Sequence, residues 1–296
     1  MTIWNSHAGI GLEKVGMKTL LFLSDLSNGY EEEDKVIGRY LGLFYDVVYS
    51  DIYSCEALED KADIVLVRNT WPWSSNQIGA EEIDRYRSAK TALRKRLTTK
   101  NIYTYNANNG RGDMQGKQHI LDLQAANYPV IPSITRTEDL HRLPRAERYR
   151  IKPMNGFSAW LQGSYAPDAL PALMPDHFII QPHISFRQEI SVYYVDSMVF
   201  CVAACPDKGK VDMHIIDDVD NRYIAFAEQF RKWNTLSHGL QRIDFIETQH
   251  GELLLMEIED DAPYYSLIYY NNDMKKKFFS MLHHSLEENS KQRIAA

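Results

Sequence analysis

Two short runs near the carboxyl terminus carry charged side chains in a spacing that could hold a cation. The four side chains are those of Arg242, Asp244, Glu257 and Glu259. A turn at His250-Gly251 separates the runs, and glycine accepts the positive φ of a two-residue hairpin loop, so we expect two antiparallel strands. In the register set by that turn, Asp244 faces Glu257 and Arg242 faces Glu259. Side chains alternate along a strand, so all four share one face.

Directly opposed carboxylates destabilise a sheet, and a cation between them would remove that penalty. Mg²⁺ takes oxygen ligands and is commonly held by one or two carboxylates together with a substrate phosphate. The pattern therefore favours a site for Mg²⁺ and a nucleotide. The alternative is a solvated acidic strand with Arg242 in a surface ion pair. The opposite face is expected to join the core and carries Ile243, Phe245, Leu254, Met256 and Ile258.

Two lysines lie in segments of a kind that contacts phosphate. Lys117 follows Gly116 at the start of a helix expected over 118–127, and Lys152 lies in a strand expected over 148–153. The next residues, 155–163, form a loop with two glycines and Ser158, which could offer backbone N–H groups to a phosphate. The loop has neither the Walker A nor the GxGxxG pattern. Because the nucleophile-elbow pattern is also absent, Ser158 is not read as a catalytic nucleophile.

The first third of the chain alternates short apolar runs with helical patterns. Strands are expected over 18–23, 46–50, 63–68 and 102–106, and helices over 31–44 and 80–97. This rhythm predicts a small open parallel sheet with helices on its faces. Ligands of such sheets bind beyond the carboxyl ends of the strands, here near 68–73 and 106–110. Trp71 and Trp73 in the first of these loops could equally pack within the loop.

The second half favours antiparallel strands. A buried-type strand over 177–184 ends in Gln181, Pro182, His183 and Ile184. A hairpin is expected from strands 188–195 and 198–204, joined by a turn at Asp196-Ser197. Glu189 lies at the start of this hairpin. It is either a functional residue or a charge at the edge of a strand. Helices are expected over 137–143, 221–233 and 273–288, and residues 217–220 are read as a solvated acidic loop.

Composition excludes several classes of protein. The 296 residues are 44% hydrophobic and 25% charged, as in soluble globular proteins, and predict about two domains. A net charge of −7 argues against general nucleic-acid binding. No apolar run reaches the roughly 20 residues of a membrane span, and no secretory signal is recognisable. Three cysteines without metal-ligand spacing suit a reducing, cytoplasmic location. Residues 1–16 are read as an extension.

Taken in order, these motifs resemble the ATP-grasp superfamily. They run from Gly116-Lys117 through Lys152 with its loop, the segment 181–184 and Glu189 to the charged hairpin. The likeness is to the glutathione-synthetase-like branch of carboxylate–amine ligases, a branch that includes the D-cycloserine-forming ligase. It covers roughly residues 17–288. It implies an α/β (α+β) ATP-grasp fold with three parts: an N-terminal open parallel sheet over 17–112, a small central α+β subdomain over 113–184, and a C-terminal antiparallel-sheet subdomain over 185–296.

The resemblance also implies roles for individual residues. Lys117 and Lys152 would contact ATP phosphates, and the loop with Ser158 would close over the γ-phosphate. The backbone of Gln181, Pro182, His183 and Ile184 would recognise adenine, and Glu189 would bind the ribose. Asp244, Glu257 and Glu259 would hold Mg²⁺. Arg242 would neutralise the transition state.

The implied activity is an ATP- and Mg²⁺-dependent ligation of a small-molecule carboxylate to an amine. An acyl phosphate would form first, and an amino acid or small peptide would be the substrate. The alternatives are an ATP-grasp small-molecule kinase and a nucleotide-binding protein that has lost catalysis. Glu259 stands where several ligases have Asn. A further phosphate-binding cation could be Lys208, Lys210 or Arg222, and a homo-oligomer is possible.

Overall fold

The computed structural model describes residues 16–25, 31–70, 80–154, 163–170, 178–206, 213–261, 263–267 and 270–294. Expectations that concern other residues lie outside this part of the chain. They concern the extension before residue 16, Trp71, Trp73, the loop 155–162 with Ser158, Lys208 and Lys210.

The N-terminal third forms the expected parallel sheet, with strand order β2-β1-β3-β4. Its strands are β1 (Thr19–Leu23), β2 (Asp46–Ser50), β3 (Ile64–Val67) and β4 (Tyr103–Tyr105). Helices α1 (Glu31–Leu41), α2 (Glu56–Glu59) and α3 (Ala80–Thr99) connect them. Four of the five residues of β1 are buried, as continuous apolar strands are in a parallel sheet covered on both faces. One face packs on α3 and the other on α1 and the C-terminal helix α6 (Asn272–Ile294).

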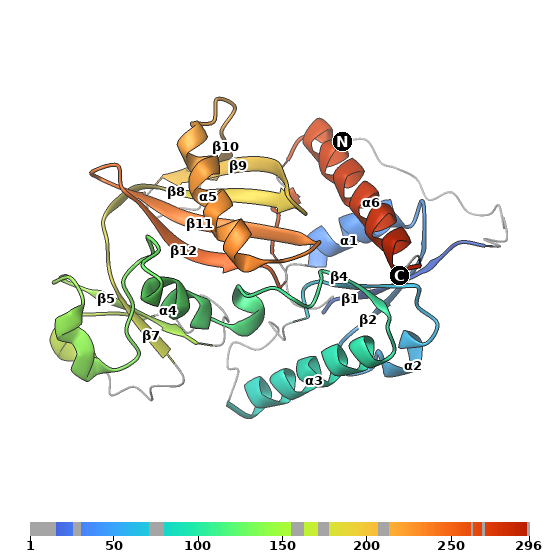
Figure 1. Cartoon of the computed structure of the whole chain (residues 1–296), viewed down its shortest axis with the longest axis horizontal. Helices are drawn as coiled ribbons and strands as arrows, with labels where there is room; N and C mark the ends of the chain where they lie inside the picture. The colour runs from blue at the N-terminus through green and yellow to red at the C-terminus, as the bar shows by residue number, and fades with distance from the viewer. Residues whose placement is uncertain are drawn as a thin grey trace.

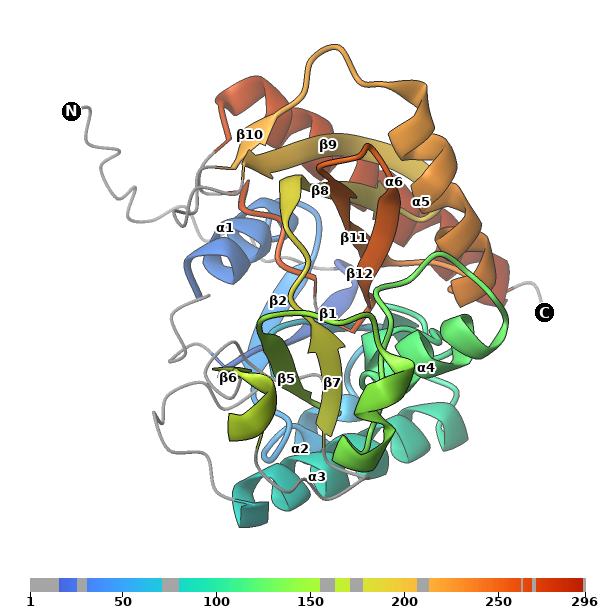
Figure 2. The same cartoon turned by 90° about the vertical axis from the view of Figure 1, so that its left-hand side faces the viewer.

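A small antiparallel sheet of order β6-β5-β7 occupies the middle of the chain. Its strands are β5 (Tyr149–Pro153), β6 (Gly163–Tyr165) and β7 (Phe178–Pro182). Before it come η1 (Asp113–Gln115), α4 (Gln118–Ala125) and η2 (Thr137–Arg142), and η4 (Pro167–Ala169) follows β6. The helix expected over 137–143 is therefore a 3₁₀ helix, which suits so short a segment. The chain then passes from β7 through a three-residue connection into strand β8 (Phe186–Val195) (Figure 2).

The second half builds a larger antiparallel sheet of order β10-β9-β8-β11-β12 (Figure 1). Its strands are β8 (Phe186–Val195), β9 (Met198–Pro206), β10 (His214–Ile215), β11 (Leu240–Thr248) and β12 (Leu253–Glu259). Helix α5 (Asn221–Asn234) covers one face, and the Asp220 side chain caps it by accepting a hydrogen bond from the N–H of Arg222. The last residue of the acidic loop 217–220 is thus the N-cap of a helix.

One hydrophobic cluster joins the two ends of the chain. It includes Leu20 and Phe22 of β1, Phe200 of β9, and Phe278 and Leu282 of α6, all almost completely buried. The C-terminal helix is therefore packed against the N-terminal sheet as well as the large antiparallel sheet (Figure 1). The domain boundaries expected at residues 112 and 184 fall between the three sheets and remain a prediction. No described helix is long and apolar enough to cross a membrane.

Candidate active site

The hairpin β11–β12 brings the four charged residues together in the expected pairs, but its loop and its register differ from the expected ones. Asp244 pairs with Glu257 and Arg242 with Glu259, but Phe245 pairs with Leu255, one position away from the expected register. The loop has three residues rather than two: the N–H of Thr248 bonds to Glu252 O, and Gly251 adopts φ +83°. A β-bulge then adds Met256 to β12, and this extra residue restores the expected pairs.

The bulge changes which side chains of β12 reach the core. Ile243, Phe245 and Ile258 are completely buried, as expected. Leu254 and Met256 are only half-buried, so their expected place in the core is wrong, and Leu255 lies there instead. A shift of one residue moves a side chain to the other face of a strand, and the bulge shifts the alternation at this point.

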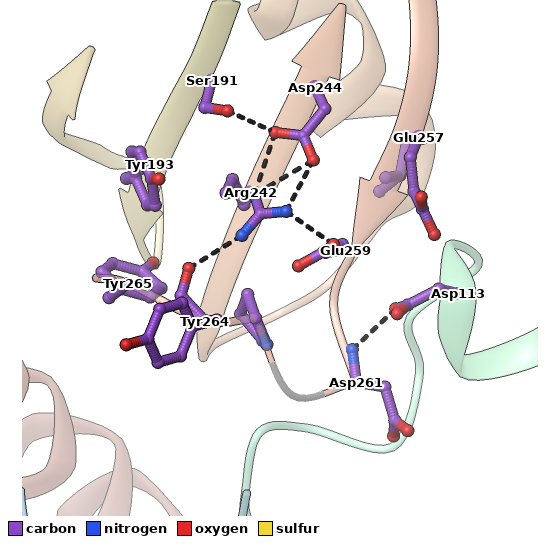
Figure 3. Close-up of polar contacts among 12 residues, drawn as sticks. Asp113, Ser191, Tyr193, Arg242, Asp244, Glu257, Glu259, Asp261, Tyr264 and Tyr265 are labelled. Carbon is purple, nitrogen blue, oxygen red and sulfur yellow. Dashed lines mark hydrogen bonds and ion pairs between the residues drawn. The ribbon is translucent and has the colours of Figure 1, made fainter. Parts of the chain in front are cut away.

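Arg242 lies at the centre of the charged face (Figure 3). Its Nε donates to both carboxylate oxygens of Asp244, at 2.9 and 3.0 Å, and its Nη2 donates to Glu259 at 2.6 Å. Nη1 donates to the backbone oxygen of Tyr264 at 2.8 Å. The Ser191 hydroxyl, from the neighbouring strand β8, donates to Asp244 at 2.7 Å. Bidentate contacts of this kind set both the position and the plane of the guanidinium.

The two lysines come from separate elements and meet beside this face. The N–H of Lys117 bonds to Met154 O at 2.5 Å, which ties the start of α4 to the end of β5 and hence to Lys152. Lys117 and Lys152 are 3% and 5% exposed. Lys117 forms an ion pair with Glu257. Lys152 pairs with none of the described carboxylates, and burial, together with the charges of Lys117 and Arg150, lowers its pKa to about 7.

Strand β8 places Glu189 on the same face. It is two residues from Ser191, which pairs with Asp244, and four from Tyr193, which pairs with Arg242. Burial raises the pKa of Glu189, and the nearby charge of Asp244 adds to the shift. Gln181 and Pro182 are buried at the end of β7, where Gln181 Nε2 donates to the Ser133 hydroxyl. His183 and Ile184 form the connection to β8 at the edge of the same region.

Three polar residues that sequence reasoning missed hold the two halves of this face together; two of them are buried and the third, Asp113, is half-buried. His119 of α4 is 1% exposed; its Nε2 accepts the N–H of Ile258, between two of the charged residues, and its Nδ1 contacts Gly116 O at 2.8 Å. Because burial lowers the pKa of His119 to about 4, the ring is neutral. An acceptor at Nε2 then makes Nδ1–H the donor to Gly116.

The other two are Asp113 and Asp260, which exchange backbone hydrogen bonds. Asp113 accepts the N–H groups of Asp260 and Asp261, and the Asp260 carboxylate accepts those of Gly112 and Met114, all at 2.7 to 2.9 Å. Burial raises the pKa of Asp260 well above its usual range, and Asp113 beside it adds to this shift. The sequence Gly-x-Gly-Asp at residues 110–113 is the one local signal of this contact. A Cβ at Gly112 would lie 2.7 Å from Ile258 O, so the close approach of the two segments requires glycine there.

Two residues expected near a ligand at the ends of the parallel strands are instead structural. Arg68 is 3% exposed and forms ion pairs with Glu33 and Asp34, at 2.6 and 3.0 Å. Asn106 is also buried and donates to the backbone oxygens of Leu240 and Asp260. Asn106 thus joins the end of β4 to the β11–β12 hairpin, and Arg68 joins the end of β3 to α1, so both side chains are buried in contacts within the protein.

Arg222 faces away from the charged residues. It forms an ion pair with Glu247, which is three residues from Asp244 on β11. An odd spacing along a strand places the Glu247 and Asp244 side chains on opposite faces. Tyr223 of α5 donates to the same Glu247 carboxylate, which confirms that this pair lies on the α5 face of the sheet. Of the three cations considered for phosphate, only Lys208 and Lys210 stay open.

The donor chemistry fits Mg²⁺ and phosphate, although no three described His, Cys, Asp or Glu side chains form a ready metal cluster. Asp244, Glu257 and Glu259 offer the oxygen donors that Mg²⁺ prefers. Lys117 and Arg242 neutralise these carboxylates in the structure. A buried lysine that lacks a carboxylate partner, as Lys152 does among the described residues, is stabilised by an anion.

Of the comparisons with known proteins, the one with solved structures gives matches. No family model matches the chain, and no curated protein matches it. Among solved structures it is similar to D-cycloserine synthetase DcsG, with a TM-score of 0.66 and 16% identity over 93% of this chain and 99% of that one. It is also similar to the D-alanine–D-alanine ligase of Bacillus anthracis, with a TM-score of 0.63 and 12% identity over 93% and 99% of the two chains.

A third similar structure is the ATP-grasp ligase PsnB, in a complex with a precursor variant, Mg and ADP. Its TM-score is 0.58 at 14% identity, over 90% of this chain and 99% of that one. The chain has the ATP-grasp fold. The expected fold class is therefore confirmed. Within the ATP-grasp fold of this chain, the small sheet with Lys152 and the large sheet with Arg242 face each other across the β7–β8 connection (Figure 2).

Proposed function

We propose that this chain is an ATP- and Mg²⁺-dependent ligase that activates a carboxylate as an acyl phosphate and couples it to an amine. The observation that carries the proposal is the pair of buried lysines next to the carboxylates of the β11–β12 hairpin. Two buried cations beside three carboxylates match the charges of a phosphate chain with a divalent metal ion. ATP would supply the phosphoryl group that makes a carboxylate electrophilic, and Mg²⁺ would neutralise the phosphates.

Each residue of the site has a task in this proposal. Lys117 and Lys152 bind phosphate oxygens, and Asp244, Glu257 and Glu259 hold Mg²⁺. The backbone of residues 181–184 binds adenine and Glu189 binds the ribose. Arg242, already oriented by Asp244 and Glu259, stabilises the negative charge that develops on the reacting group. Ser158 and its loop exclude water, because an acyl phosphate hydrolyses readily.

The names of the similar structures support a substrate class. Their names include a D-cycloserine synthetase, a D-alanine–D-alanine ligase and an ATP-grasp ligase in a complex with a variant of a minimal precursor. We infer that the carboxylate and the amine belong to an amino acid, a small related molecule or a peptide.

The test is incubation of the purified protein with ATP, Mg²⁺ and a panel of amino acids and dipeptides. ADP release and product mass are measured together, and an amide formed with one ADP per bond is the expected result. A stable phosphorylated substrate without an amide would contradict ligation and support the kinase alternative. No ADP release with any carboxylate would support the inactive nucleotide-binding protein.

Glu257→Gln tests the metal assignment within the same assay. It should lower ADP release by at least about 100-fold, because a metal ion contributes several kcal/mol of charge stabilisation to the transition state. The matched control is Glu252→Gln, an exposed glutamate of the same hairpin, which should keep full activity. A Glu257→Gln protein that is folded and fully active would show that Glu257 holds no metal.

A further inference from the structure

Arg150 is a cation of the site that the proposed roles leave without a task. It lies on β5 two residues before Lys152, so both side chains project from the same face, about 7 Å apart along the strand. Tyr149 and Ile151 project from the other face and are buried, and Tyr149 belongs to a separate apolar cluster with Ile180. Arg150 is therefore placed on the face of the small sheet that carries the phosphate-type lysine.

The register places Arg150 on the side of Lys152 that is nearer to the β7–β8 connection. Arg150 pairs with Gln181, while Lys152 pairs with Ile179, further from the connection. Arg150 Nε donates to His183 Nδ1 at 3.4 Å. The guanidinium thus lies beside the segment that would bind the base, one step along the strand from the lysine that would bind phosphate.

Its charge is available to a ligand. The side chain is exposed and pairs with none of the described carboxylates, unlike Arg242. The charge of Arg150 nevertheless acts on two groups of the site. It helps to lower the pKa of Lys152, and it partly offsets the rise in the pKa of Glu189. An exposed cation that influences buried Lys152 and half-buried Glu189 lies at the mouth of the site.

We propose that Arg150 binds the nucleotide by stacking its guanidinium plane on the purine base held at residues 181–184. A guanidinium is planar and weakly hydrated, so it stacks on aromatic faces, which a lysine ammonium cannot do in the same way. Every nucleobase offers such a face. This inference rests on the proposed function, because it needs the base to bind at the β7–β8 connection.

The test measures the binding of ATP and of inorganic tripolyphosphate, with Mg²⁺, by calorimetry. Arg150→Ala should weaken ATP binding by about three- to fivefold, as expected for a cation–π contact at an exposed site, and should leave tripolyphosphate binding unchanged. Arg150→Lys keeps the charge but not the plane, and should lose most of the same affinity. In turnover, KM for ATP should rise while kcat stays the same.

Arg148→Ala is the matched control. Arg148 directly precedes β5, but its guanidinium bonds to Ser164 of β6, away from the connection, so ATP binding should not change. If Arg150→Ala lowers the affinities for ATP and for tripolyphosphate equally, Arg150 binds phosphate and the stacking proposal is overturned. Unchanged ATP binding would overturn any nucleotide role for Arg150 while leaving the ligase proposal intact. Wild-type protein that binds neither ATP nor tripolyphosphate would overturn both proposals.

Discussion

At the scale of single residues, the site is a set of charges whose balance depends on burial. Arg242 is oriented by two carboxylates and a backbone oxygen before any substrate arrives. Lys117 has a carboxylate partner, whereas Lys152 has none among the described residues. An incoming phosphate would therefore gain most from Lys152, because it would satisfy a buried cation instead of displacing an existing partner.

The lowered pKa of Lys152 makes ATP binding depend on pH. In the free protein this pKa is about 7 instead of the usual 10.5, so the side chain is charged below pH 7 and increasingly neutral above it. ATP affinity should fall above pH 7, by up to about tenfold per pH unit, because binding must then recharge the lysine. Lys152→Arg, which stays charged, should bind ATP with little pH dependence, as titration calorimetry from pH 6 to 8.5 would show.

The lowered pKa of Lys152 affects the stability of the free protein in the opposite direction: ATP affinity falls as the pH rises, whereas stability increases. Between pH 7 and 10.5 the unfolded chain keeps the proton that folded Lys152 releases, so the contribution of Lys152 to stability rises with pH in this range. Lys152→Ala should remove this contribution and raise the KM for ATP strongly. An ATP affinity of the wild type that does not change with pH would contradict a neutral Lys152.

At the scale of elements, β12 is an edge strand that other segments cover. Leu255 bonds through its backbone to Pro129 and Ile131, and Ile258 bonds to His119. The bulge at Met256 lies between these contacts. Bulges increase local twist and re-aim side chains, so the direction of Glu257 and Glu259 depends on how firmly this edge is held.

His119→Leu tests that dependence. The Ile258 N–H would lose its acceptor in a buried place, which should lower the free energy of unfolding by about 1–3 kcal/mol. The Mg²⁺ concentration needed for half-maximal activity should also rise, since Ile258 lies between Glu257 and Glu259. His141→Leu, at an exposed histidine of η2, is the control and should change neither quantity. A loss of stability without any change in the Mg²⁺ requirement would limit His119 to a structural role.

At the scale of the whole molecule, a buried charge cluster links the parallel sheet to the active-site loop. Glu33 of α1 accepts the N–H groups of Tyr265 and Leu267, and Arg68 donates to Pro263 O. The next residue, Tyr264, provides the backbone oxygen that Arg242 binds. The loop 263–267 is therefore held between the N-terminal third of the chain and the charged hairpin, although 195 residues separate Arg68 from Pro263 in sequence.

Arg68→Ala should destabilise the protein by about 3–5 kcal/mol, because it leaves the buried carboxylates of Glu33 and Asp34 without their cation. Urea unfolding measures this effect. Arg87→Ala, which breaks an exposed pair with Asp84, should change stability by no more than about 1 kcal/mol. Equal effects of the two substitutions would show that the buried cluster does not hold the molecule together.

Much of the architecture could be predicted from local patterns. Alternation of strand and helix predicted the parallel sheet, and period-two alternation placed Arg242 and Asp244 on one face of β11. These features depend on residues close in sequence, where backbone geometry alone sets the direction of side chains. The pairing of Asp244 with Glu257 was also predicted, although a two-residue turn was assumed where a three-residue loop and a bulge compensate each other.

Contacts between distant segments were decided only by the folded chain. Packing partners far away in sequence decide three features of the site. They decide which buried residue of α4 reaches β12, which aspartates exchange hydrogen bonds, and on which face of the sheet Arg222 lies. Local patterns carry no such information, because a polar residue that will be buried looks the same as one that will be exposed. Tertiary structure therefore turned a row of charged side chains into a site with buried lysines on one side and an oriented arginine on the other.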